Sequence, residues 1–338
     1  MPLTGVDVLD PGECFVSVVA VAQIGGLRVI EPDLDIALTQ DWRAHRHRAD
    51  VVRLRAGDPA DWDALRTRGF AVKPTWVTWG APLTGSREEF LSRVSPKELR
   101  NVRKALDYAR VNRLRFVERT PISPEPLDEF LRLYGLQIAR MVHGVPYAQR
   151  MRQRLLDEAN RFMMVSAHDR GGLVAGCICS LRPDQDVMRI AFSAIQPRAR
   201  DGMLSRAIYL TAADAARARG LKWISLGSDP TLYGHVAKPG LFTFKSRLGF
   251  APVPLSWLDY EDVEAYDEAE LMLSLSSVTD PSLSLAYAAE VPPRPNVTDA
   301  WSTPPLWRLN ILASRKDIDI RPFAAPFLDS LDVAVLAK

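Results

Sequence analysis

The sequence predicts an α/β protein built on a mixed sheet, and three observations carry this prediction. Residues 161–195 hold three short apolar runs separated by turn residues, which is typical of antiparallel strands. Residues 203–219 form an amphipathic pattern that Gly220 ends, as expected for a helix. Residues 221–260 then indicate a strand, a helix and a further strand. This order indicates an α+β arrangement in which helices cover a mixed sheet.

Length and composition restrict the class of protein. A chain of 338 residues, 47% hydrophobic and 25% charged, predicts a globular protein with two domains, or one domain with long extensions. The formal net charge of +2 is too small to indicate nucleic-acid binding without local clustering of the basic residues. Residues 15–22 are apolar but too short to span a bilayer and lack preceding basic residues, so they predict a buried strand and neither a targeting signal nor a membrane partner.

The three cysteines are Cys14, Cys177 and Cys179, which form neither a disulfide framework nor a metal-binding set. We therefore expect a reduced, cytoplasmic compartment and no metal site. Cys177 and Cys179 lie on the same side of a predicted strand, where small buried hydrophobic side chains are the expected role.

Changes in composition divide the chain into three segments. Residues 1–120 form an amino-terminal αβ region that ends in a basic helix, and residues 121–260 form the main αβ domain. Residues 261–338 are a carboxy-terminal extension whose fold the sequence does not specify. In it, residues 261–270 predict a short helix or a charged turn, and residues 306–312, 318–323 and 327–336 predict strands.

The basic helix begins near Ser95, which together with Glu98 forms a predicted capping box. Its predicted apolar stripe consists of Leu99, Val102, Leu106 and Ala109. Four cations gather on another face at helical spacing: Lys97, Arg100, Arg103 and Lys104. This face predicts a platform for phosphates or an RNA backbone, and a solvated surface helix is the alternative.

The stretch from 221 to 260 holds the residues best suited to chemistry. Residues 227–230 predict a turn, residues 231–248 a helix interrupted near Pro239, and residues 250–257 an edge strand. Near the end of that helix, Lys245 stands next to Phe244, with Arg247 two residues on. A lysine in a strand–helix–strand frame is suited to meet a phosphate or a developing oxyanion.

Three polar residues before the interruption near Pro239 are candidates for proton transfer. His235 suits general-base catalysis because its ordinary pKa is near neutrality, and Tyr233 and Asp229 are candidate relays. The alternatives are a surface histidine, a packed tyrosine, and helix capping by Ser228 and Asp229.

The order of elements over residues 161–260 resembles the GNAT acyltransferase fold. In that family a glycine-containing loop before the long helix binds the pyrophosphate of acetyl-CoA. The matching loop spans residues 196–205, in which Gly202 keeps a glycine, and Arg198 and Arg200 supply positive charge. Asp201 departs from the pattern because it places a carboxylate where phosphate would bind.

A narrower resemblance is to the Fem-type branch of this superfamily. It is carried by the helix SPKELRNVRKAL and the later motif GLFTFKSRLGF, within residues 76–260. Fem-type enzymes are two GNAT-like halves that transfer an amino acid from aminoacyl-tRNA to an amine. The resemblance implies a GNAT fold, either single or as a tandem or degenerate double GNAT. It also implies that Phe244 meets the tRNA acceptor end and that Lys245 steadies the tetrahedral intermediate.

Three functions follow as hypotheses. The first is an N-acyltransferase that moves an aminoacyl group from tRNA to an amine, and the second is an acetyl-CoA- or acyl-CoA-dependent N-acyltransferase acting on a small-molecule amine. The third is a non-catalytic relative that binds RNA or protein. The expected partners are tRNA and a small amine, and no tightly bound cofactor is expected. The sequence predicts neither the identity of the acceptor nor an oligomeric state.

Overall fold

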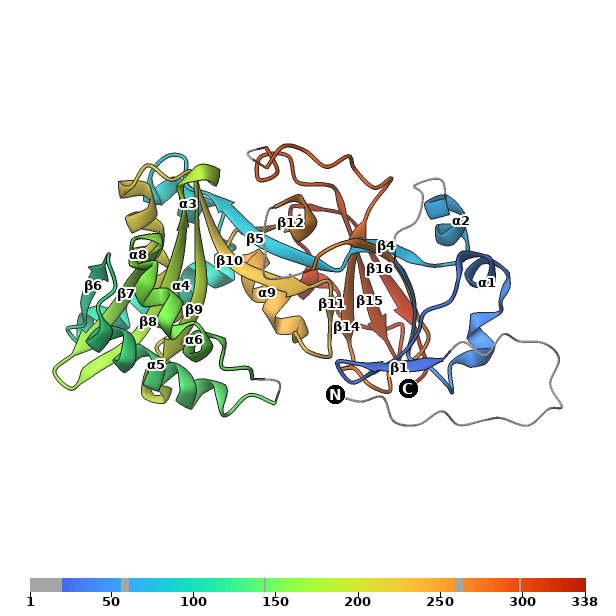
Figure 1. Ribbon diagram of the computed structural model, residues 1–338, viewed down its shortest axis with the longest axis horizontal. Coiled ribbons are helices and arrows are strands. Elements are labelled where there is room, and N and C mark those ends of the chain that lie inside the picture. The colour runs from blue at the N-terminus through green and yellow to red at the C-terminus, as the bar shows by residue number, and fades with distance from the viewer. Residues whose placement is uncertain (1–19, 56–60, 143, 259–263, 298) are drawn as a thin grey trace.

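The computed structural model describes residues 20–55, 61–142, 144–258, 264–297 and 299–338. The molecule is elongated, with one sheet at one end and two smaller sheets towards the other (Figure 1). The helices of the described chain are α1 Leu34–Thr39, α2 Asp61–Thr67, α3 Arg87–Ser92, α4 Pro96–Val111, α5 Pro124–Ile138, α6 Tyr147–Arg150, α7 Arg152–Asp157, α8 Ser205–Ala218 and α9 Pro239–Arg247.

The strands form three sheets. The seven-stranded sheet has the order β12-β5-β10-β9-β8-β7-β6. Its strands are β5 Trp76–Pro82, β6 Arg115–Arg119, β7 Phe162–Asp169, β8 Gly172–Arg182, β9 Val187–Ile195, β10 Trp223–Pro230 and β12 Ala251–Pro254. The five-stranded sheet, in the order β1-β2-β3-β13-β4, holds β1 Val21–Ile24, β2 Leu27–Ile30, β3 Val51–Arg55, β4 Ala71–Pro74 and β13 Asp267–Met272. The four-stranded sheet runs β11 Leu232–Tyr233, β14 Ser282–Tyr287, β15 Trp307–Ala313 and β16 Leu328–Val335.

The seven-stranded sheet confirms the predicted GNAT-like order. Strands β6 to β9 form an antiparallel meander, and α8 then crosses over so that β10 pairs with β9 in parallel. A second parallel pair joined by a helix occurs in the five-stranded sheet, where β2 and β3 flank α1. Two such units on two sheets are consistent with a double GNAT-like fold.

Each sheet combines segments that are distant in sequence. The chain leaves the five-stranded sheet at the end of β4 and enters the seven-stranded sheet as β5, where it lies between β10 and β12. In return, β13 lies between β3 and β4. The sheets therefore draw strands from both sides of residues 120 and 260.

Helix α4 packs against α8, but its buried stripe differs from the predicted one. Val102, Ala105 and Ala109 are buried, whereas Leu106 is exposed. The stripe is shifted because the small residues Ala105 and Ala109 allow close approach to the alanine-rich α8. The Ser95 side chain accepts from the backbone N–H of Glu98, but the Glu98 carboxylate turns to Arg206 and Asn101, so the predicted reciprocal capping box does not form.

Four further sequence predictions are wrong, wholly or in part, in the carboxy-terminal half. Residues 227–230 continue β10 through a bulge in which Gly227 has φ +74°, and only residues 239–247 of the predicted 231–248 helix are helical. The described part of 261–270 includes the start of strand β13, which pairs with β3 on one side and β4 on the other. In 318–323 the structure has a short 3-10 helix at Arg321–Phe323.

Two predictions about packing are confirmed. Strand β12 is an edge strand of its sheet, as its two prolines require. Cys177 and Cys179 are free and buried, with their sulfur atoms 3.7 Å apart. Cys14 and most of the predicted strand at 15–22 lie outside the described residues. None of the described helices combines the length and the apolar character needed to cross a membrane.

Candidate functional site

The candidate site lies where β9 and β10 separate, a place we call the β9–β10 fork. The two strands pair in parallel only from Trp223 to Ser225, opposite Val187 to Arg189. Beyond this point β10 bends at the Gly227 bulge and follows β5, whereas β9 continues along β8. Past this point the two strands no longer pair with each other, and side chains from the neighbouring helices lie along them.

Lys245 points from α9 to the β10 side of the fork. Its side-chain nitrogen lies 2.8 Å from Asp229 Oδ2, and both residues are buried, at 4% and 5% exposure. Burial lowers the pKa of Lys245, the Asp229 carboxylate opposes that shift, and the positive charge of Arg189 adds to the lowering. The predicted catalytic lysine is therefore held next to a carboxylate inside the protein and not on an outer surface.

Tyr233 and Trp79 continue this contact into the core. The Tyr233 hydroxyl donates to the same Asp229 oxygen over 3.2 Å, and the Trp79 indole N–H donates to the Tyr233 hydroxyl over 3.2 Å. Burial raises the pKa of Tyr233 well above its ordinary value, and the neighbouring Asp229 charge reinforces the shift. Tyr233 has no exposure to solvent, so its position suits holding Asp229 better than relaying a proton to a substrate.

Phe244 lies on the side of α9 that faces α8. Its ring packs 6.3 Å from the Tyr209 ring, centroid to centroid, and the Arg206 guanidinium lies 4.6 Å from the Phe244 centroid. Tyr209 in turn shares a 3.0 Å hydrogen bond with Ser193 of β9. The two neighbouring residues therefore face different strands. Phe244 is linked to β9 through Tyr209, and Lys245 contacts Asp229 of β10. Arg247 is directed away and donates to the Pro322 carbonyl.

His235 belongs to another environment. It follows β11 and neighbours Gly25 of the β1–β2 turn. Burial lowers its pKa to about 4, Glu270 opposes the shift, and Lys73 and Arg53 add to it. The charges that act on His235 thus differ from those that act on Lys245, and no hydrogen bond between these two residues is present in the described structure.

The predicted phosphate-binding loop is engaged within the protein. A Cβ at Gly202 would lie 2.5 Å from the Tyr108 ring, so an aromatic ring from α4 covers the glycine. Arg198 forms an ion pair of 2.8 Å with Asp169 and also contacts Gln196, whereas Arg200 is exposed.

The edge of β9 that faces the fork is also occupied. The Gln137 side chain donates to the Ser193 carbonyl over 3.3 Å and accepts from the Ile195 N–H over 3.2 Å. A carboxamide that makes both contacts takes the place of a peptide group from an adjacent strand. An extended donor with amide groups would have to displace Gln137 to bind this edge.

The cationic face of α4 lies open to solvent. Its four predicted residues are all exposed: Lys97, Arg100, Arg103 and Lys104. The opposite side of α4 is tied to α8 by the buried carboxylate of Glu98, which lies 2.6 Å from Arg206. The helix therefore presents its positive charge outward while an ion pair fixes its position.

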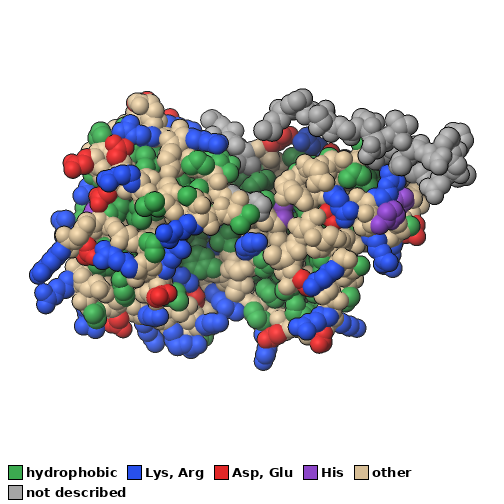
Figure 2. Space-filling view, turned by 90° about the horizontal axis from the view of Figure 1, so that it is seen from below, with side chains coloured by type: hydrophobic (Ala, Val, Ile, Leu, Met, Phe, Trp, Pro, Cys, Tyr) green, Lys and Arg blue, Asp and Glu red, His purple; other side chains and the backbone are tan. Residues whose placement is uncertain are grey.

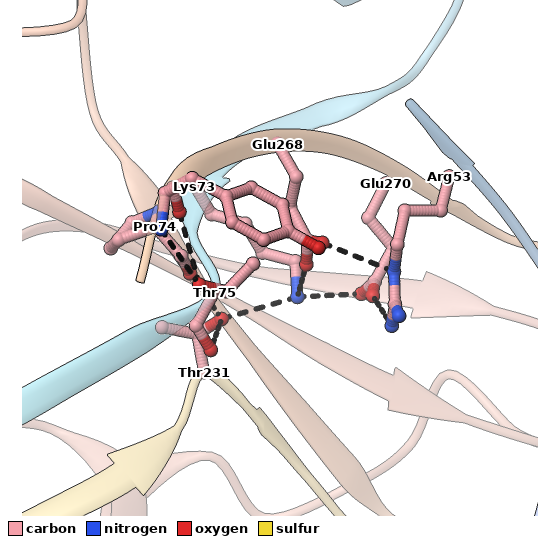
Figure 3. A network of polar contacts seen from close by, with 8 residues as sticks. Arg53, Lys73, Pro74, Thr75, Thr231, Glu268 and Glu270 are labelled. Carbon is pink, nitrogen blue, oxygen red and sulfur yellow. Dashed lines mark hydrogen bonds and ion pairs between the residues drawn. The ribbon is translucent and has the colours of Figure 1, made fainter. Parts of the chain in front are cut away.

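A second buried ionic cluster, which the sequence predictions missed, lies on the five-stranded sheet. Lys73 contacts Glu268 at 3.2 Å and Glu270 at 2.9 Å, and Arg53 contacts the same two carboxylates at 3.1 Å each (Figure 3). Lys73 also donates to Thr231, which follows β10. Burial raises the pKa of Glu268, whereas Lys73 and Arg53 overcome burial and lower the pKa of Glu270. The alternation of Glu268 and Glu270 with Ala269 was the available signal, because it puts both carboxylates on one face of a strand.

The molecular surface is hollowed midway along its length. Figure 2 shows hydrophobic side chains in the hollow and Lys and Arg side chains around it. No group of three or more histidines, cysteines or carboxylates suited to a metal ion occurs among the described residues. A separate cavity of about 280 Å³ lies between the five-stranded sheet and helices α1 and α2, lined by Leu54, Trp62 and Leu65 among others.

Comparison with known proteins gives fold similarity at low sequence identity. No protein-family model and no curated protein matches the chain. Among solved structures, FemX is similar with a TM-score of 0.44 and 12% identity, over 71% of this chain and 80% of that chain.

Two further similar structures have lower scores. The C-terminal domain of a putative lysylphosphatidylglycerol synthetase from Agrobacterium fabrum has a TM-score of 0.39 and 12% identity, over 72% of this chain and 77% of that chain. A tandem GNAT protein from the clavulanic acid biosynthesis pathway has a TM-score of 0.34 and 11% identity, over 69% of each chain. The chain resembles these proteins in fold, and its own strand order gives it the GNAT-like architecture that the sequence predicts.

Proposed function

We propose that the protein is an N-acyltransferase that moves an aminoacyl group from aminoacyl-tRNA to an amine. The observation that carries the proposal is the buried Lys245 ammonium at the β9–β10 fork, next to Phe244 on α9. A cation in a water-poor site is suited to stabilise an oxyanion, because the low dielectric strengthens its field.

The reaction requires one positive charge next to the carbonyl oxygen of the donor ester. The amine nitrogen attacks the ester carbonyl carbon, a C–N bond forms, and the carbonyl oxygen becomes an oxyanion that Lys245 stabilises. The bond from carbon to the ribose oxygen of tRNA then breaks, and the proton lost by the amine passes to that oxygen. Phe244 offers a ring on which the terminal base of the donor stacks.

The contacts at the fork favour tRNA over acyl-CoA as donor. Gln137 covers the strand edge along which an extended amide-bearing donor would lie. Tyr108 covers Gly202, and Arg198 is paired with Asp169. The exposed cations of α4 are available to an RNA backbone.

Lys245→Ala tests the catalytic step. Protein is supplied with amino acids, ATP, bulk tRNA and an extract that provides synthetases and amines, and amide products are followed by mass spectrometry. Loss of one oxyanion donor is expected to lower the rate by about 10²–10³-fold. Lys222→Ala is the matched control because Lys222 is an exposed lysine paired with Asp186, and it should leave the rate unchanged. Unaltered turnover in Lys245→Ala contradicts the proposed role.

Ribonuclease treatment tests the donor. Product formation should stop when RNA is destroyed. Product that persists after this treatment, with acetyl-CoA alone as donor, would instead assign the acyl-CoA-dependent reaction.

The α4 face is tested by RNA binding at several salt concentrations. The binding constant falls as salt rises, so log K against log salt has a negative slope. Replacement of Arg100, Arg103 and Lys104 by Ala should reduce the magnitude of this slope by about 2–3, because each lost phosphate contact contributes about 0.7–0.9. The control is replacement of the exposed pair Arg315 and Lys316, which lies outside α4. An unchanged slope in the α4 variant counts against RNA binding on this face.

A further inference from the structure

The Lys245 site is completed by a strand from the amino-terminal part of the chain. Trp79 belongs to β5, which enters the seven-stranded sheet between β10 and β12. Its indole N–H donates to Tyr233, Tyr233 donates to Asp229, and Asp229 contacts Lys245. Three short contacts therefore connect β5 to the lysine on α9.

The direction of these hydrogen bonds is determined by the groups involved. An indole N–H can only donate, so the Tyr233 oxygen accepts from Trp79 and its hydroxyl hydrogen is left for Asp229. Asp229 Oδ2 thus receives both the tyrosine hydroxyl and the lysine ammonium. An acceptor fixed by a neutral donor on one side holds the cation on its other side in one position.

Aromatic packing leaves this chain of contacts little freedom. The Phe242 ring contacts Trp79 and Tyr233 edge-on, with centroids 5.5 and 5.7 Å away, and Phe327 packs on Trp79 at 5.7 Å. Trp79 and Tyr233 have no solvent exposure. Their polar atoms therefore depend on one another, because water has no access to replace a lost partner.

We propose that Asp229 is a positioning residue that keeps the Lys245 side chain charged and directed at the β9–β10 fork, and that Tyr233 and Trp79 hold Asp229 in place for this task. The inference rests on the proposed function for its consequence in catalysis. It makes the amino-terminal strand β5 a part of the site, although β5 supplies no group to the substrate.

Lysine NMR tests the inference without a substrate. The chain has eight lysines, so the side-chain signals of protein labelled in lysine can be resolved and Lys245 assigned by its loss in Lys245→Arg. Asp229→Asn should move the titration of Lys245 to lower pH, and Asp229→Glu should restore it in part. Asp186→Asn is the control, and it should move the signal of Lys222 alone.

Tyr233→Phe and Trp79→Phe test the outer part of the chain of contacts. Tyr233→Phe removes one hydroxyl from an otherwise unchanged ring, so it keeps the test valid even where Asp229→Asn does not fold. Both variants should shift the Lys245 signal, Tyr233→Phe more than Trp79→Phe, and move the pH profile of transfer in the same order.

The outcomes separate this inference from the proposed function. A Lys245 titration that Asp229→Asn leaves unchanged, or a Lys245 signal that Tyr233→Phe leaves in place, overturns the positioning role. Shifts of the Lys245 signal as expected, without any aminoacyl transfer in the wild type, would uphold the positioning of Lys245 and reject the proposed reaction.

Discussion

Two buried lysines of this protein have different electrostatic surroundings. Lys73 contacts two carboxylates that also share Arg53, so two cations and two anions form a closed set. Among the described residues, Lys245 pairs with one carboxylate, Asp229, which also accepts from the neutral Tyr233 hydroxyl, and the charge of Arg189 acts on Lys245 as well. An ammonium has three donors, and Asp229 takes one of them.

The difference indicates different roles. In the Lys73 cluster, two cations and two anions from β3, β4 and β13 form ion pairs with one another, which favours the observed register of these strands. In the Lys245–Asp229 pair, the ammonium has further N–H groups that can donate to a ligand. Buried groups with a shifted pKa of this kind are typical of functional sites. Burial alone therefore does not distinguish the two lysines, but the balance of charge around them does.

The largest expected effect comes from breaking the closed set. Lys73→Met leaves Glu268 and Glu270 next to each other with only Arg53 as counter-charge, and should lower the free energy of unfolding by about 3–5 kcal/mol. Denaturant unfolding measures this loss. Lys222→Met, which breaks a largely exposed pair, should cost less than about 1 kcal/mol. Similar losses in the two variants would show that the cluster carries no special stability.

A smaller effect is expected at the lysine site. Asp229→Asn should lower the free energy of unfolding by about 2 kcal/mol at neutral pH, because Lys245 can lose its proton, and with it most of the penalty for an unpaired buried charge. Burial already lowers the pKa of Lys245, and loss of Asp229 lowers it further. The unfolded chain then binds more protons than the folded one up to the unfolded pKa of about 10.4, so stability rises with pH in that window.

The measurement is unfolding of wild type and Asp229→Asn from pH 7 to pH 10. The difference between the two proteins should shrink as the pH rises. A difference that stays constant would mean that Lys245 does not titrate within this range in the variant.

The last effect, of similar size, concerns His235, on which the charged groups Glu270, Lys73 and Arg53 act. Its pKa of about 4 in the folded protein is below the ordinary value of 6.5, so the unfolded chain binds the proton first as the pH falls. Stability should decline by about 2 kcal/mol from pH 6.5 to pH 4, allowing for partial exposure. His235→Gln should flatten this decline, and the exposed His47→Gln should not. Equal pH dependence in both variants would assign the decline to other groups.

The sequence predicted the parts of the fold that depend on neighbouring residues. The three strands within residues 161–195, the helix that ends before Gly220 and the Phe-Lys pair on α9 all have the local signals from which they were predicted. The stretch from Gly227 to His235 was mistaken for a turn and a helix. Its glycine and proline residues instead lie in a bulge of β10 and in the connection to β11. These strands pair with β5 and β14, which are far away in sequence.

By itself, the sequence determined the meander and crossover of the GNAT-like sheet and the placement of Lys245 on the last helix of that unit. Only the tertiary structure decided that Trp79 and Tyr233 stand behind Asp229, and that Glu268 and Glu270 enclose Lys73. The physical reason is that the residues of a strand do not specify which other strand it will pair with. Lys73 meets its two carboxylates only because the sheet brings the distant strand β13 next to β4.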